Sequence, residues 1–249
     1  MSETQPEPTT DSKAAGFRTT HWSVVLAAGG GASPDAAEAL ERLCRSYWYP
    51  LYAFVRRKGY PHHDAEDLTQ GFFARFLEKR YLDEVAAEKG RFRTFLLCSL
   101  SHFLANAWDT SQRLKRGGGA THVPLDTIDA EERYRLEPNP SGTLEDSFDR
   151  AWAETLLSLA LARLRGDFES AGKGERFEEL KPFLLGEPGS GAYARISVRL
   201  GMSEQGVKSA VHRLRRTFRE LIREEIAHTV ATRSEIEDEL RYLIRLMTG

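Results

Sequence analysis

The sequence predicts an all-α protein, and three observations support this fold class. Apolar residues recur at steps of three and four along most of the chain, which is the period of an amphipathic helix. No stretch alternates Val, Ile and Thr with polar residues, so essentially no β-sheet is expected. Hydrophobic residues make up 41% of the 249 residues and aromatic residues 10%, which supplies enough apolar surface for packed cores.

Breaks in the helical pattern divide the chain into two small domains. Three consecutive glycines at 29–31 and again at 117–119 interrupt the pattern, and residues 126–154 carry nine acidic and three basic side chains. We interpret this acidic part as a flexible or weakly ordered linker. The expected organisation is a disordered tail over 1–16, a first domain over 17–116, a linker over 117–150, a second domain over 151–226 and a C-terminal helical extension over 227–249.

Three amphipathic helices account for the first domain. The first is expected to start at Ser33 and Pro34, which suit the N-cap and the first helical position, and to end before Gly59. The apolar stripes of the next two helices are Ala65, Leu68, Phe72, Phe76 and Leu77, and then Phe92, Phe95, Leu96, Leu100, Phe103, Leu104 and Ala107. Cys44 and Cys98 have no metal-ligand spacing, and both are expected to pack in the core.

The second domain is also expected to be helical. It begins with a helix near Trp152, followed by a short helix near residues 177–185. Two further helices are expected to begin at Ala192 and Glu204, and a last amphipathic helix covers residues 235–247. The sequence leaves three roles open for that last helix: it caps the second domain, mediates self-association or binds a regulator.

The sharpest local pattern is a helix-turn-helix over residues 192–216. Gly201 follows the first helix, where a left-handed backbone is expected, and Ser203 is a good N-cap for the second helix. Met202 is expected to fill the turn between the two helices. One stripe of the second helix is apolar and consists of Val207, Val211, Leu214, Phe218 and Leu221.

The opposite face of the second helix is typical of a recognition helix that enters the DNA major groove. Its side chains can donate hydrogen bonds to base edges or phosphates. They are Gln205, Lys208, Ser209, His212, Arg213 and Arg216. Residues 190–223 carry eight basic and two acidic side chains, whereas the whole chain has a net charge of −2. An ordinary helical hairpin with a solvated basic face is the alternative, but the local charge favours DNA binding.

A family resemblance begins in the first domain, at residues 64–70. This segment, Asp-Ala-Glu-Asp-Leu-Thr-Gln, resembles the region-two signature of the extracytoplasmic-function (ECF) sigma factors of bacterial RNA polymerase. The helix-turn-helix resembles region four of the same family, and the likeness covers about residues 36–116 and 150–225 in the right order. The resemblance implies a non-enzymatic sigma factor that binds core RNA polymerase and promoter DNA and directs transcription initiation.

The resemblance implies a role for three sets of side chains. The polymerase-binding set is Asp64, Glu66, Asp67 and Gln70. The set for the downstream promoter box is Arg91, Arg93, Asn106, Trp108, Arg113, Lys115 and Arg116. Positive charge in this second set would follow phosphates, and aromatic rings would stack on unpaired bases, although Phe92 and Phe95 are expected to belong to the core. The loop over 83–90 would hold a flipped base. The upstream box would bind the six side chains of the recognition helix.

No cofactor, metal site or catalytic site is expected. A metal site is suggested by His62, His63 and Asp64, but no second histidine or acidic cluster at ligand spacing supports it. The Gly-Lys-Gly at 172–174 has neither the residue spacing nor the preceding strand of a phosphate-binding loop. The N-terminus has no signal-peptide pattern and no run is apolar enough to span a membrane, so a cytoplasmic protein without membrane insertion is expected. The resemblance also allows an anti-sigma factor or another regulator as a partner.

Two other functional interpretations remain open. One is a helix-turn-helix transcriptional regulator whose N-terminal helical domain senses a ligand or a partner. The other is a protein-interaction module that sequesters another regulator. The ligand-sensing regulator needs neither the acidic face at 64–70 nor the basic and aromatic helix that follows it. The interaction module has no use for a basic recognition face.

Overall fold

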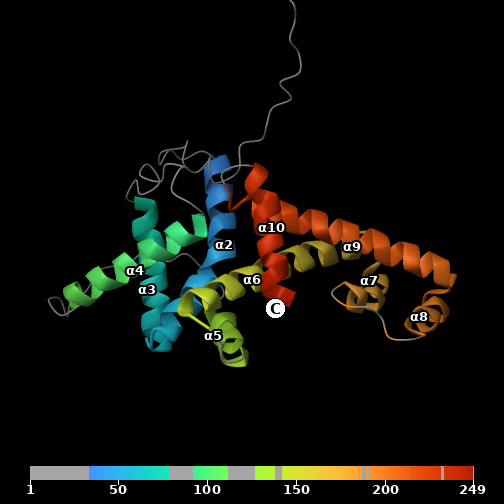
Figure 1. Cartoon of the computed structure of the whole chain (residues 1–249), viewed down its shortest axis with the longest axis horizontal. Helices are drawn as coiled ribbons and strands as arrows, with labels where there is room; N and C mark the ends of the chain where they lie inside the picture. The colour runs from blue at the N-terminus through green and yellow to red at the C-terminus, as the bar shows by residue number, and fades with distance from the viewer. Residues whose placement is uncertain are drawn as a thin grey trace, which may run out of the picture.

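The protein is all-helical, as predicted, in the part of the chain that the structure describes (Figure 1). The computed structural model describes residues 34–78, 92–111, 127–137, 142–184, 186, 189, 191–230 and 233–248. The predicted tail, the predicted loop over 83–90 and the start of the predicted linker lie outside these residues. Within them there is no strand, and none of the helices is long and apolar enough to cross a membrane.

Long helices in the middle of the molecule join two ends (Figure 1). The helices are α2 (Pro34–Arg57), α3 (His62–Glu78), α4 (Phe92–Ser111), α5 (Thr127–Leu136), α6 (Leu144–Ser170), α7 (Gly174–Leu180), the 3-10 helix η2 (Lys181–Phe183), α8 (Ala192–Leu200), α9 (Glu204–Ala227) and α10 (Arg233–Thr248). At one end α2 packs against α3 and α5, and at the other α9 packs against α7 and α8. The helices α6, α9 and α10 lie between, in mutual contact.

Helix α2 supplies much of the core at the first end. It begins at Pro34, as predicted, and its middle is lined with buried aromatic side chains. They are Tyr47, Trp48, Tyr49, Tyr52 and Phe54. The helix ends at Arg57, and Gly59 then adopts a left-handed backbone with φ of 97° before α3 starts at His62. The predicted break after the first helix is therefore confirmed.

Helix α6 packs against both ends of the molecule. It starts after a capping box, in which Thr143 and Asp146 each accept a hydrogen bond from the backbone N–H of the other. Near this start Phe148 contacts Phe54 of α2 edge to face. Near its other end, α6 packs against α7 and is tied to α9. One 27-residue helix thus links the parts that the sequence assigns to separate domains.

The predicted linker contains a helix, α5, and this is the main difference from the sequence-based expectation. Residues 127–136 are helical, and α6 begins at Leu144 and not near Trp152. The acidic residues of α5 pair with α2: both oxygens of Glu131 accept hydrogen bonds from Arg56 at 3.0 Å, and Glu137 binds Arg57 just beyond the helix. Acidic side chains that suggested a solvated linker therefore hold α5 in place.

The carboxyl group of Glu131 is expected to make the fold sensitive to acid. Burial would raise its pKa, but hydrogen bonds from Tyr52 and Arg56 outweigh burial and lower the pKa from 4.5 to about 2. The stabilisation is therefore complete above pH 4.5 and is lost as the pH falls towards 2. At about 1.4 kcal/mol for each pKa unit, we expect that loss to be about 3 kcal/mol.

The prediction is tested by measuring the free energy of unfolding in urea for wild type and Glu131→Gln, from neutral pH down through this acidic range. A chelator is present to exclude metal ions. The wild-type protein should be the more stable at neutral pH, and the difference should shrink as Glu131 becomes protonated. A difference that stays constant with pH would show that the ionised carboxylate does not stabilise the fold.

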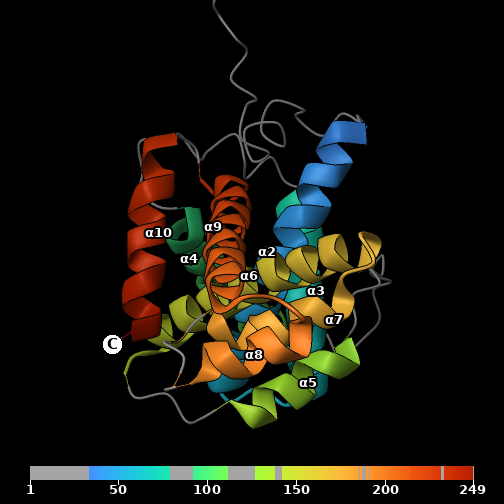
Figure 2. The same cartoon turned by 90° about the vertical axis from the view of Figure 1, so that its right-hand side faces the viewer.

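Helix α10 is held against the other helices by the buried guanidinium of Arg93. This α4 side chain is 4% exposed, donates from Nε to Asp149 of α6 at 2.9 Å and donates from Nη1 to Glu239 of α10. Its guanidinium carbon also lies 4.7 Å from the ring centroid of Trp152 and 4.4 Å from that of Tyr242. One cation therefore joins α4, α6 and α10. Helix α10 also lies alongside α9, as Figure 2 shows.

The two cysteines have different environments. Cys44 is buried in α2, as predicted, and burial followed by the charge of Glu41 raises the pKa of its thiol to about 12. Cys98 in α4 is exposed, so the prediction that it packs in the core is wrong. Its neighbours Leu97 and Leu100 are buried, and Cys98 lies on the other side of the same helix. A small apolar residue within an apolar run does not by itself show which side faces the core.

Candidate nucleic-acid interface

A tight turn between α8 and α9 sets the geometry of the candidate interface. Gly201 has φ of 60° and ψ of 33°, the left-handed conformation predicted for it. The N–H of Gly201 binds the carbonyl of Val198 at 3.3 Å, and the N–H of Met202 binds that of Ser197 at 2.9 Å. This is a Schellman motif, which satisfies carbonyls at the end of α8.

The start of α9 is capped as the sequence predicts. The hydroxyl of Ser203 accepts a hydrogen bond from the N–H of Gly206 at 3.1 Å, so one of the unpaired donors of the first turn is satisfied. Met202 is partly buried and packs against the core beneath the turn. Together the two caps fix where α8 ends and where α9 begins.

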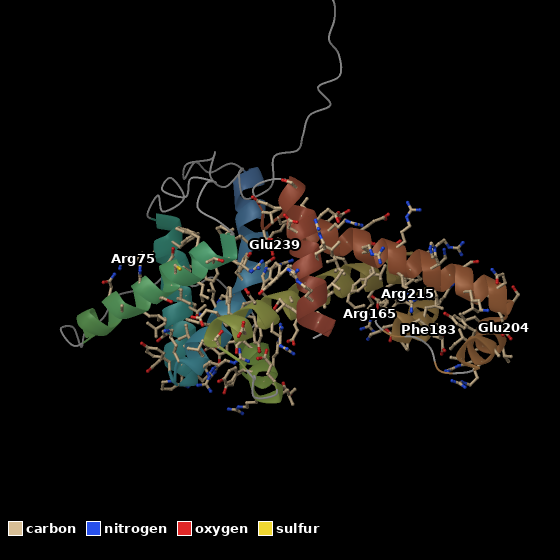
Figure 3. All side chains as sticks on the ribbon, viewed as in Figure 1. Arg75, Arg165, Phe183, Glu204, Arg215 and Glu239 are labelled. Atoms are coloured by element: carbon tan, nitrogen blue, oxygen red, sulfur yellow. The ribbon has the colours of Figure 1, made fainter. Side chains whose placement is uncertain are left out.

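The apolar stripe of α9 is buried as predicted. The predicted stripe residues are all 7% exposed or less, and they are Val207, Val211, Leu214, Phe218 and Leu221. Arg215 strengthens this packing, and the sequence pattern did not predict that role. Its guanidinium donates to the carbonyl of Phe183 at 2.8 Å and to that of Gly186 at 2.7 Å. Arg215 and Phe183 are labelled in Figure 3. Arg215 thus holds the segment after α7 against α9.

The structure brings the six predicted recognition side chains together on one exposed face of α9. All six are exposed: Gln205, Lys208, Ser209, His212, Arg213 and Arg216. The face extends over eleven residue steps, or about 17 Å of helix, a length that can follow several base pairs in the major groove. Arg216 binds Glu220 at 3.0 Å, but this pair is well exposed and therefore weak. The basic groups remain accessible to an anionic partner.

Three of the four predicted polymerase-binding residues lie on the side of α3 that faces away from the core. Ala65 and Phe72 are buried, as expected for the core-facing side of this helix. Asp64 and Asp67 are exposed and Gln70 is half-buried.

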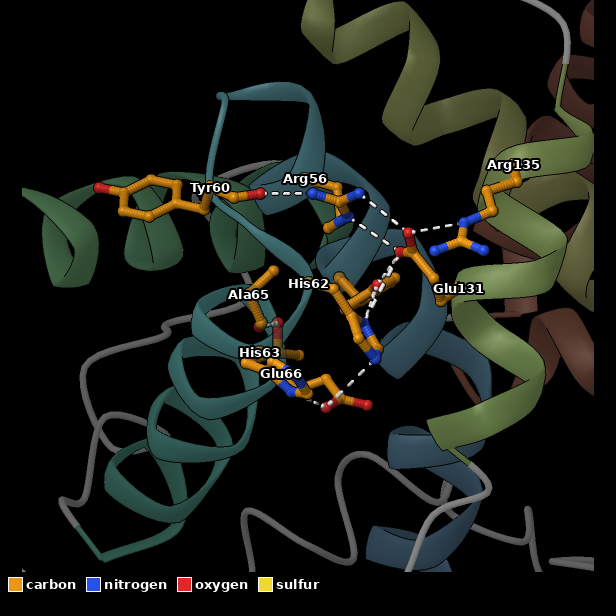
Figure 4. A network of polar contacts seen from close by, with 10 residues as sticks. Arg56, Tyr60, His62, His63, Ala65, Glu66, Glu131 and Arg135 are labelled. Atoms are coloured by element: carbon orange, nitrogen blue, oxygen red, sulfur yellow. Dashed lines mark hydrogen bonds and ion pairs between the residues drawn. The ribbon is translucent and has the colours of Figure 1, made fainter.

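Glu66 belongs to a different group. Its carboxylate faces His62 and His63, and only 16% of its side chain is exposed (Figure 4). Three of the four predicted residues therefore remain for an external surface on α3, and Glu66 has internal partners.

Of the residues predicted for the downstream promoter box, the structure describes the side chains of two, and it places them thirteen positions apart on α4 rather than together. Arg93 is buried and paired, so its prediction as a nucleic-acid contact is corrected: in this structure its guanidinium holds helices together. Asn106 is exposed on α4. Phe92 is buried and Phe95 is half-buried against the core, as predicted. The remaining members, whose side chains lie outside the described residues, are Arg91, Trp108, Arg113, Lys115 and Arg116.

A histidine and glutamate cluster at the start of α3 was missed from the sequence. His62 Nε2 and His63 Nδ1 lie 3.7 Å and 4.0 Å from the same Glu66 oxygen. No second histidine or acidic cluster was expected at ligand spacing from these histidines, but Glu66 follows them by four and three residues on one helix and completes a group of three. That spacing was visible in the sequence.

Comparison of the chain with protein-family models, with curated proteins and with solved structures found no match. The geometry of this molecule is therefore the basis for its proposed function. Two surfaces are relevant: the basic face of α9 behind a doubly capped turn, and the acidic side of α3. They lie toward opposite ends of the molecule (Figure 1).

Proposed function

We propose that this protein is a sigma factor of the ECF type, which binds core RNA polymerase and directs it to promoters. The observation that carries the proposal is the exposed face of α9, where six donor side chains lie behind a capped turn. Between residues 205 and 219 this helix has no acidic residue, although the chain as a whole is slightly acidic. Such local positive charge is what a DNA backbone attracts.

The proposed action of α9 is non-covalent. The helix enters the major groove of the upstream promoter box with its buried stripe turned towards α7 and α8. Arg213 and Arg216 bind phosphates or guanine edges, while Gln205, Ser209 and His212 read the donor and acceptor pattern of the bases. Phosphate contacts supply affinity that depends on salt, and base contacts supply specificity.

The side of α3 that carries Asp64, Asp67 and Gln70 is the proposed polymerase-docking surface. Support comes from the exposure of the two aspartates on a helix whose other side is anchored in the core. Exposed carboxylates complement a basic partner and speed its association. The resemblance to region two assigns this surface to the clamp helices of RNA polymerase. The proposal also implies a cytoplasmic location, where polymerase and promoter DNA are found.

Helix α4 takes a smaller part in the proposed function than the resemblance implies. Arg93 does not contribute a free guanidinium, because Asp149 and Glu239 hold it. Asn106 is the predicted downstream-box residue that the structure shows exposed. We therefore assign downstream contacts to Asn106 and to the five predicted residues whose side chains lie outside the described part of the chain.

Transcription by purified core polymerase on a pool of promoter fragments from the host genome tests the proposal. Discrete start sites should appear only when this protein is added, and the double variant Asp67→Ala/Gln70→Ala should lose most of them. Asp167→Ala is the matched control, because it removes an exposed aspartate from α6, away from α3. The control should retain full activity.

The same experiment separates the proposal from its main alternative. Sequence-selective DNA binding by the protein alone, without promoter-directed transcription, would indicate a conventional helix-turn-helix regulator. Equal transcription with wild type and the Asp67/Gln70 variant would remove α3 as the docking surface. Absence of both DNA binding and transcription would leave a protein-interaction module.

A further inference from the structure

Three side chains with metal-binding chemistry converge at the start of α3. They are His62, His63 and Glu66, and one ligand atom from each lies within 4.8 Å of the others. The distance between His62 Nε2 and the nearest Glu66 oxygen is 3.7 Å, and that between His63 Nδ1 and the same oxygen is 4.0 Å. These separations are too long for hydrogen bonds. Two ligands of a tetrahedral Zn²⁺ ion lie about 3.4 Å apart, so small side-chain movements would close the site.

The hydrogen bonds around His62 determine which of its ring nitrogens faces the cluster. Tyr52 uses its hydroxyl proton to donate to Glu131, and the same hydroxyl oxygen lies 2.8 Å from His62 Nδ1. The tyrosine oxygen therefore accepts from Nδ1–H, and this network assigns the proton to Nδ1. Nε2 then presents a lone pair towards Glu66. Two electron-pair donors facing one another in this way are suited to a cation between them.

The surroundings of His62 also match those of metal-bound histidines. A ligating histidine usually donates its second ring N–H to an oxygen, which fixes the orientation of the ring and raises the basicity of the ligating nitrogen. Tyr52 fills that role here, with the Glu131 carboxylate behind it at 3.6 Å from Nδ1. Arg56 and Arg135 in turn bind Glu131. His62 is therefore held in place before any ion binds.

We propose that His62 Nε2, His63 Nδ1 and the Glu66 carboxylate form a binding site for a Zn²⁺ ion. Two imidazole nitrogens and one carboxylate suit zinc and similar transition ions, whereas Mg²⁺ and Ca²⁺ prefer oxygen ligands. The side chain of His63 is 89% exposed, so it can turn towards the other two without disturbing the fold. Water completes the coordination. The site stands independently of the proposed function, because it involves neither α9 nor a polymerase contact.

Zinc titration of the purified full-length chain against a chromophoric chelator tests the site. Wild type should bind one Zn²⁺ ion in competition with the chelator, and excess Mg²⁺ should not displace it. His63→Ala and Glu66→Gln should each weaken zinc binding by about tenfold or more. His102→Ala is the matched control, because it removes an exposed histidine from α4, and it should leave the affinity unchanged. Since His63 is so exposed, its variant tests ligation without a risk to folding.

A Co²⁺ titration adds a readout of coordination. Wild type should give the visible absorption bands of cobalt bound by nitrogen and oxygen ligands, and His63→Ala should lose or shift them. Equal zinc affinities for wild type and His63→Ala would overturn the proposal, because the ion would then be bound by other histidines of the chain. Failure of wild type to bind zinc at millimolar concentrations would overturn it as well.

Discussion

Glu239→Ala is expected to lower the free energy of unfolding by about 3 kcal/mol. The substitution removes one of the two carboxylates that neutralise Arg93, a side chain that is only 4% exposed. A buried charge that loses its partner costs more than the pair contributes, because its lost hydration is no longer compensated. Asp149 remains beside Arg93, and this keeps the expected loss at the lower end of the range for broken buried pairs.

Glu237→Ala is the matched control for Glu239→Ala on the same helix. Glu237 binds Arg223 of α9 at 2.9 Å, but both side chains are well exposed. Such a surface pair contributes at most about 1 kcal/mol. Urea unfolding of the three proteins near neutral pH, followed by the helical circular dichroism signal, gives the comparison. Similar small losses for both variants would mean that α10 can separate from Arg93 at little cost, and that the buried pair does not hold the C-terminal helix in place.

Arg213→Ala/Arg216→Ala is expected to weaken the binding of duplex DNA by about 100-fold at moderate salt, roughly tenfold for each lost phosphate contact. Both side chains are exposed on α9, and neither is needed for the apolar packing of that helix. In a plot of the logarithm of the affinity against the logarithm of the salt concentration, the negative slope should become shallower by about 2. The reason is that binding releases about one counterion fewer for each phosphate contact that is lost.

Fluorescence anisotropy with labelled duplexes at a series of salt concentrations measures both quantities. Arg241→Ala is the control, since it removes an equally basic side chain that is exposed on α10. It should leave affinity and slope close to the wild-type values. If Arg213→Ala/Arg216→Ala and Arg241→Ala changed DNA binding equally, the attraction would be a general effect of charge, and α9 would lose its assignment as the recognition helix.

Local features of this protein were predictable from the sequence because their causes lie within a few residues. The turn at Gly201 and the cap at Ser203 depend on backbone geometry over about one helical turn. The exposed face of α9 follows from the helical period once its apolar stripe is identified. The same reasoning located the starts of α2, α8 and α9 correctly.

Pairing between distant residues was decided by the tertiary structure alone. Arg93 and Glu239 are 146 positions apart, and neither residue carries a local sign that the other will neutralise it. Arg56 and Glu131 are 75 positions apart, and their pairing turns part of a predicted linker into a packed helix.

The sequence by itself therefore determined the helical fold class, the starts of α8 and α9 with the turn between them, and the basic face of α9. Only the tertiary structure decided that Arg93 is buried and that α10 packs back onto α6 and α9. It also decided that Tyr52 turns His62 towards Glu66. The physical reason is that hydrophobic periodicity and capping act along the chain, whereas ion pairs and buried hydrogen bonds depend on which distant side chains the folded chain brings together.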